Sequence, residues 1–250
     1  MNLPEATADA FRSGLAEPLA ELVEAWQLRE NGASDDTATP SLIAQAFEHL
    51  FDVMARTEAS HGAGRETVGI APEVITEAGE YALELFDQSL HWANRLDLPG
   101  VFSLLQTYTL AMTRWIAGFG GRLLTLEPVV DAFARLANST QNPGELLVLY
   151  HAMSETLSAT DPMIQKDTEK TNPGQPWRIL HLNRAIVATR THQPDLMDEA
   201  FAELAAHLPE DAAGFFSQGM EQMDLLNYPP HVRAVMDRYY RKWSINRSLH

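Results

Sequence analysis

The chain has 250 residues, of which 45% are hydrophobic and 21% are charged. This composition is typical of globular proteins and excludes a mostly disordered or collagen-like chain. The formal net charge is −16 and the pI is near 4.9. A surface of this charge repels phosphate groups, so we expect neither a nucleic-acid-binding nor a membrane-binding protein.

Two absences narrow the class of protein further. The chain has no cysteine, which excludes disulfides, cysteine nucleophiles, cysteine-ligated zinc and thiolate iron–sulfur clusters. Its first residues show no signal-peptide pattern. No apolar run reaches the roughly 18 residues of a membrane-spanning helix. We therefore expect a cytoplasmic protein.

Large apolar residues recur at intervals of three and four over residues 11–26, 42–54 and 75–96. This is the period of an α-helix with one buried face. Pro18 lies within the first segment, so we expect a kink there or two short helices. Alternation of apolar and polar residues never persists over five positions, so no strand is predicted.

Prolines precede most of the apolar-periodic segments. A proline suits the first turn of a helix, because the N–H that it lacks would have no partner there. Asn142 is expected to cap one helix, with the Glu145 side chain bonding back to it. The predicted helices are 5–28, 41–57, 72–96, 99–118, 127–138, 143–159, 175–191, 195–207, 210–226 and 229–244.

These elements predict an all-α fold of about ten antiparallel helices. They are arranged as an α-solenoid-like (tetratricopeptide-like) array or as an irregular helical bundle. We expect one domain over residues 1–250. Three stretches are predicted as loops, 29–40, 58–71 and 160–174. The last is the longest connection, so it is the expected boundary if the domain has two sub-lobes.

One pattern suggests internal repetition. Residues 131–137 are similar to residues 199–205, which start 68 positions later, twice the 34-residue tetratricopeptide period. Residues 82–90 resemble the second helix of such a repeat. The tryptophan, glycine and tyrosine of the repeat's first helix are missing at the matching positions. We therefore favour a shared amphipathic pattern over a true tandem repeat, and no family is identified.

Patterns for catalysis or metal binding are weak. Glu58 and His61 have the Glu-x-x-His spacing of di-iron bundles, which need two such motifs. Three acid–histidine pairs are spaced four residues apart: Asp87 with His91, His151 with Glu155, and Glu203 with His207. In a chain with 34 acids and nine histidines, several such pairs are expected by chance. The glycine-containing segment 118–121 has no Walker lysine and no preceding strand. We therefore expect no catalytic residue, no metal ion and no cofactor.

The C-terminal segment differs in charge from the rest of the chain, because residues 227–250 hold five basic residues and one acidic residue. We expect its helix to dock on the acidic body through Val232, Val235, Met236 and Tyr239, with its cations favoured near the helix C-terminus. The alternative is a helix that docks on a partner through arginine and tryptophan anchors.

A second basic segment covers residues 170–194, where no acidic residue occurs. Arg178, His181 and Arg184 are spaced by three and therefore share a broad helix face, with Trp177 and Asn183 nearby. Arginine offers a two-pronged fork to a carboxylate or phosphate, so we expect these five residues to bind an anionic ligand or partner segment. In the alternative, the arginines pair with acids on neighbouring helices.

The sequence favours a non-enzymatic cytosolic interaction protein, an adaptor or assembly factor that holds a segment of another protein in a helical groove. An acidic or carboxylate-bearing partner segment would suit the basic residues. Two alternatives remain open: an α-bundle enzyme, or a sensor of small anions, with its pocket near Arg178 and His181. Stoichiometric metal in the purified protein would favour the enzyme, and stabilisation by an anion would favour the sensor.

Overall fold

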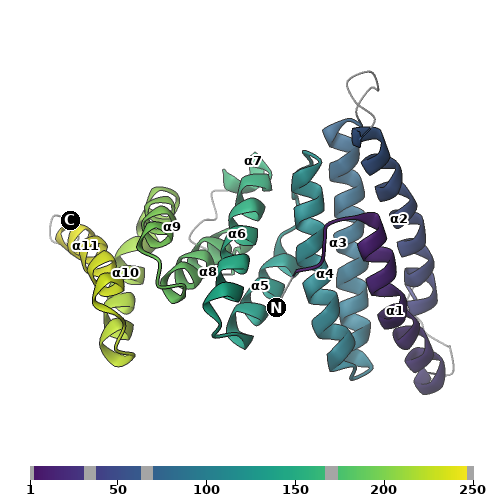
Figure 1. The fold of residues 1–250 in the computed structure, drawn as a ribbon, viewed down its shortest axis with the longest axis horizontal. Coiled ribbons are helices and arrows are strands. Elements are labelled where there is room, and N and C mark those ends of the chain that lie inside the picture. The colour runs from purple at the N-terminus through teal and green to yellow at the C-terminus, as the bar shows by residue number, and fades with distance from the viewer. Residues whose placement is uncertain (1–2, 31–37, 63–69, 167–173, 247–250) are drawn as a thin grey trace. The chain divides into compact units, whose positions relative to one another are not determined.

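The computed structural model describes residues 3–30, 38–62, 70–166 and 174–246. All regular elements in these residues are helices, as expected (Figure 1). A single parallel bridge between Leu123 and Thr160 lies outside any strand. Among the described helices, none has the length and apolar character needed to cross a membrane.

Helix starts follow the prolines. Every described helix except α1 and α5 begins at a proline, where the missing N–H would have no helical partner. The helices are α1 (Ala8–Glu30), α2 (Pro40–Gly62), α3 (Pro72–Arg95), α4 (Pro99–Gly118), α5 (Glu127–Ser139), α6 (Pro143–Ala159), α7 (Pro162–Gln165), α8 (Pro176–Arg190), α9 (Pro194–His207), α10 (Pro209–Leu225) and α11 (Pro230–Asn246).

Three local expectations need correction. Pro18 lies inside one helix, α1, so this segment is not two short helices. Helix α2 continues to Gly62, so residues 58–62 are helical rather than part of a loop. The four-residue helix α7 lies within the stretch predicted as a loop at 160–174. Parts of the predicted loops, residues 31–37, 63–69 and 167–173, lie outside the described residues.

The cap at Asn142 forms, but by a different route from the expected one. The Asn142 side-chain oxygen accepts hydrogen bonds from the backbone N–H groups of Gly144 (2.9 Å) and Glu145 (3.3 Å). The Asn142 backbone N–H donates to the hydroxyl of Thr140 (3.1 Å), and this hydroxyl donates to the Glu145 carboxylate. The Thr140 hydroxyl therefore bridges the Asn142 backbone N–H and the Glu145 carboxylate, which were expected to bond directly.

The chain divides into two compact units. The first holds residues 1–132 and 158–161, and the second holds residues 133–157 and 162–250. Helices α5 and α6 contribute residues to both units. The single domain expected over residues 1–250 stays a prediction, and so does the boundary expected at 160–174 if this domain has two sub-lobes.

The first unit is built on a four-helix bundle. Helix α1 packs against α2 and α4, and α3 packs against the same two helices, which closes the bundle (Figure 1). Its core contains aromatic rings from all four helices. The centroid of Phe11 lies 5.4 Å from that of Tyr108, and the centroid of Phe47 lies 5.1 Å from that of Phe86. Burial of these large rings supplies much of the driving force for this unit.

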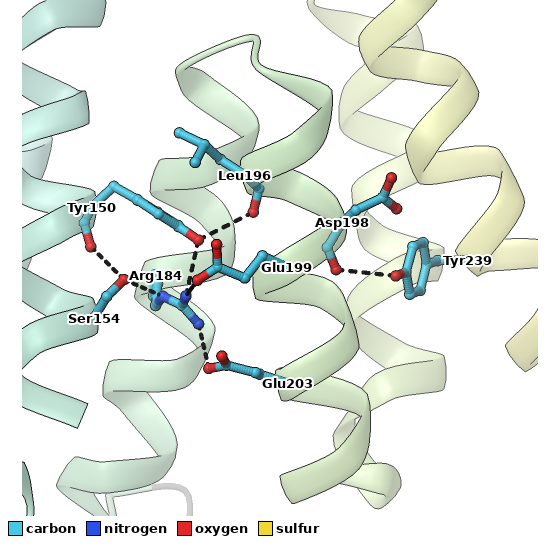
Figure 2. A network of polar contacts seen from close by, with 8 residues as sticks. All are labelled: Tyr150, Ser154, Arg184, Leu196, Asp198, Glu199, Glu203 and Tyr239. Atoms are coloured by element: carbon cyan, nitrogen blue, oxygen red, sulfur yellow. Dashed lines mark hydrogen bonds and ion pairs between the residues drawn. The ribbon is translucent and has the colours of Figure 1, made fainter. Parts of the chain in front are cut away.

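In the second unit, α8 packs against α9, and α9, α10 and α11 pack against one another. Val232, Val235 and Met236 of α11 are buried. The Tyr239 hydroxyl donates to the backbone oxygen of Asp198 in α9 (3.1 Å), as Figure 2 shows. The expected docking of the C-terminal helix on its own chain is therefore confirmed.

Candidate functional site

The five residues of the predicted binding face all lie in α8, and each arginine already has acidic partners. Arg178 forms a two-pronged ion pair with Asp211 of α10, with distances of 2.8 Å (Nε–Oδ2) and 2.5 Å (Nη2–Oδ1). This hydrogen bonding raises the pKa of Arg178 above its ordinary value. Both side chains are largely buried. Arg178 therefore ties α8 to α10.

Arg184 is the buried centre of a polar network whose two glutamates are about half exposed (Figure 2). Its side chain is 2% exposed and pairs with Glu199 and with Glu203 (2.5 Å), both on α9. It also donates to the hydroxyls of Tyr150 (2.9 Å) and Ser154 (2.8 Å) on α6. A buried guanidinium needs such partners, because an unpaired charge in apolar surroundings is strongly unfavourable. Arg184 thus joins α6, α8 and α9.

The remaining residues of the predicted face are also turned inward. Trp177 and His181 are buried, with ring centroids 4.4 Å apart. The ring of His207 lies 5.1 Å from that of His181. Asn183 is half-buried, and its side-chain nitrogen is buried with no hydrogen-bond partner among the described residues.

In these positions, Arg178 and Arg184 point toward neighbouring helices and are largely shielded from solvent. The acids that pair with Arg178 and Arg184 come from α9 and α10, as the internal-pairing alternative requires. These carboxylates already neutralise the two guanidinium groups, which weakens the attraction of either arginine for an anion. Lys170, at the start of the basic segment, lies outside the described residues. A binding role for the five residues stays a prediction. The second unit also has open cavities at another part of α8.

Two neighbouring cavities lie beside the C-terminal half of α8. The first, of about 340 Å³, is lined by α8, α10 and α11, and the second, of about 390 Å³, lies by the α5–α6 connection. They share Arg190, Leu226 and Tyr228. We call the two cavities together the Arg190 groove. The apolar lining side chains include Ile186, Phe215, Met223 and Met236 in the first cavity, and Pro143, Leu146 and Pro229 in the second. Polar side chains also line them: Thr189, Gln218 and Gln222 in the first, and Gln141, His192 and Asn227 in the second.

The groove exposes apolar side chains to solvent. Ile186 is 46% exposed and Leu226 is 62% exposed. Large apolar side chains gathered at a concave site are typical of protein or ligand binding, whereas isolated ones are ordinary. Arg190 is the sole lysine, arginine, aspartate or glutamate among the described residues that line the two cavities.

Arg190 is held in place by backbone oxygens. Its Nη1 donates to the carbonyl of Ala137 (2.7 Å), and its Nη2 donates to the carbonyl of Thr140 (2.5 Å). Within the described part of the chain, no carboxylate pairs with this guanidinium. Arg190 therefore brings to the lining of the groove a positive charge that no carboxylate among the described residues pairs with.

Local backbone geometry shapes the groove. A Cβ placed on Gly219 of α10 would lie 2.6 Å from the sulfur of Met236, so a larger residue there would require the flexible end of the Met236 side chain to shift. His192 and Asn227 adopt left-handed φ angles of 59° and 51°, which end α8 and turn the chain between α10 and α11. Asparagine tolerates this conformation better than most residues.

The Arg190 groove is formed in part by α8, which also holds the five predicted binding residues, but none of those five lines it. Arg190 was part of the basic segment, yet Ile186, Leu226 and Tyr228 were not singled out. One local signal was present: Leu225 and Leu226 form an apolar pair immediately before a turn rich in asparagine and proline. The rest depends on how α8, α10 and α11 pack.

The first unit has an acidic cavity of about 510 Å³, lined by Glu80, Glu84, Asp87 and Glu127, among others. Glu80 has a structural role there, because its carboxylate accepts from the backbone N–H groups of Leu124 (2.8 Å) and Thr125 (3.1 Å). In the described ranges, no group of three or more histidines and acids is placed to hold a metal ion.

Comparison with family models, with curated proteins and with solved structures gave no match.

Proposed function

We propose that this protein is a non-enzymatic interaction module, an adaptor or assembly factor, that holds a segment of a partner protein in the Arg190 groove. The observation that carries the proposal is the exposed apolar lining of the groove, above all Leu226 and Ile186. Grooves between helices commonly take apolar side chains of a partner peptide. The cytoplasmic location expected from the cysteine-free sequence stays part of this proposal.

The composition of the groove suits a peptide rather than a small charged metabolite. Met223 and Met236 contribute flexible thioether side chains, which adapt to the shape of a bound apolar group. The shared lining residues join the two cavities into a longer site. The enzyme and anion-sensor alternatives centre on Arg178 and His181, where Asp211 already occupies the Arg178 fork.

Two adjacent leucines provide a sharp test. Leu226 lines both cavities, whereas Leu225 lines neither, and both side chains are exposed, at 62% and 71%. Affinity purification with quantitative mass spectrometry should be carried out with the wild type, Leu226→Asp and Leu225→Asp. We expect Leu226→Asp to lose partner proteins that Leu225→Asp retains, because a carboxylate in the groove opposes burial of apolar groups.

Melting temperatures of the two variants should match that of the wild type, since both positions are exposed. Retention of every partner by Leu226→Asp would overturn the proposal, and so would equal loss from both variants. Direct binding of a recovered partner should then be measured by calorimetry with the same three proteins.

A further inference from the structure

We infer that the partner segment carries an aspartate or glutamate with an apolar residue on each side, and that its carboxylate binds Arg190. This inference rests on the proposed function and specifies the chemistry of the occupant. It follows from three features of the groove. These are the position of Arg190, the lack of a described carboxylate that pairs with it, and the cavities on either side of it.

Arg190 lies where the two cavities meet, because it lines both of them. A segment that fills the groove must therefore pass this guanidinium. Leu226 and Tyr228, the other shared residues, place apolar surface at the same point. The group that binds here must accept hydrogen bonds while its neighbours are apolar.

The charge of Arg190 lacks the compensation that the other α8 arginines have. Arg178 pairs with Asp211, and Arg184 pairs with glutamates. Arg190 instead donates to two backbone carbonyls, and no described carboxylate reaches it. A guanidinium has five N–H donors, so donors remain beyond those given to Ala137 and Thr140. A partner carboxylate would supply the missing negative charge.

The guanidinium is also held ready for binding. Its two carbonyl contacts fix a long side chain, so less conformational freedom is lost when a ligand binds. The net charge of −16 repels acidic peptides from most of the surface. A positive group in an apolar groove would therefore direct an acidic segment to this place, with an affinity that falls as salt screens the attraction.

The two cavities favour an internal acidic residue over a C-terminal carboxylate. A chain that ended at Arg190 would fill one cavity and leave the other empty. A chain that continues can place one apolar side chain among Ile186, Phe215 and Met223, and another near Pro143 and Leu146. The occupant is thus an apolar–acidic–apolar segment within a longer chain.

The test is selection from a displayed library of random peptides on the full-length wild-type protein, with Leu226→Asp as the counter-selection. We expect enriched peptides to share an aspartate or glutamate between apolar residues. For one such synthetic peptide, replacing the acid by its amide should weaken binding by about tenfold, as for loss of a charged hydrogen bond. Adding sodium chloride should weaken binding of the acidic peptide much more than binding of the amide peptide.

The arginine itself is then tested with Arg190→Gln, which should bind the acidic and amide peptides about equally. If this variant fails to fold, the acid-to-amide change in the peptide and the salt dependence of binding to the wild type still test whether a carboxylate is recognised. Groove-dependent peptides without an acid would overturn this inference and leave the proposed function intact. Peptides that bind wild type and Leu226→Asp equally would count against the proposed function as well.

Discussion

Arg184 donates a 2.9 Å hydrogen bond to the phenol oxygen of Tyr150 while its guanidinium carbon lies 4.8 Å from the centroid of the same ring. Both side chains are almost completely buried. A cation is therefore held between α6 and α9 by a phenol, a serine hydroxyl and two glutamates (Figure 2). The role of this arrangement within the second unit is to join helices.

The first prediction concerns this cation. Arg184→Ala should lower the free energy of unfolding by about 3 kcal/mol, because it leaves a cavity and removes the partner of buried polar groups. Urea denaturation measures the change. Arg241→Ala is the matched control, since Arg241 is 74% exposed and pairs with Asp237 on the surface. It should change stability by less than about 1 kcal/mol. Equal effects of the two substitutions would contradict a structural role for Arg184.

The second prediction concerns alkaline pH. Burial raises the pKa of Tyr150 to about 12, although the charge of Arg184 acts in the opposite direction. Because the pKa in the unfolded chain is near 10, the neutral phenol stabilises the folded state fully below about pH 10. This contribution is lost as the pH rises from about 10 to 12.

Urea unfolding of the wild type and Tyr150→Phe from pH 8 to pH 11.5 tests this prediction, and the other tyrosines cancel in the comparison. At pH 8 the variant should be less stable by about 1 kcal/mol, for the lost hydrogen bond. Above pH 10 the difference should shrink. A difference that stays constant with pH would show that Tyr150 ionises as readily in the folded protein as in the unfolded chain.

Most of the fold follows from local signals in the sequence. The predicted helix at 99–118 agrees with α4, and the one at 72–96 agrees with α3 to within one residue. Proline and apolar period act within a few residues, so sequence reasoning detects them. The extension of α2 past residue 57 depends instead on distant contacts. The Glu58 carboxylate accepts from the backbone of Ala8 (2.8 Å) and from the Trp115 indole (3.0 Å).

The surroundings of the α8 arginines were less predictable, because they too depend on contacts between residues far apart in the sequence. Glu199 and Glu203 lie 15 and 19 residues after Arg184, and nothing local distinguishes them among 34 acids. Arg190 differs from Arg184 only in what the neighbouring helices bring to it. The sequence therefore identified α8 as unusual, but the pairing of its arginines depends on the packing of α6, α9 and α10.

The third prediction uses two glycines with opposite surroundings. A Cβ on Gly14 would lie 1.5 Å from the Tyr108 hydroxyl oxygen, whereas one on Gly214 would meet nothing within 4 Å. Gly14→Ala should destabilise the protein by about 2 kcal/mol, because the Tyr108 ring must move within the core. Gly214→Ala should stabilise it by about 0.5–1 kcal/mol, since alanine is the better helix former. Chemical denaturation of both variants measures the changes, and effects of the same sign would contradict the close approach of α1 and α4.

The last prediction concerns how α11 is attached to the second unit. Val235 is 6% exposed and lies on the same face as Val232 and Met236, whereas Ala234, one position earlier, is exposed. Val235→Asp should lower the free energy of unfolding by about 3 kcal/mol, because it buries a charge without a partner. Ala234→Asp adds the same charge to the same helix and should have little effect. If both variants unfold like the wild type, α11 is not held by its apolar face. If only Val235→Asp is destabilised, then α11 is a fixed wall of the Arg190 groove, which is what peptide binding beside Met236 requires.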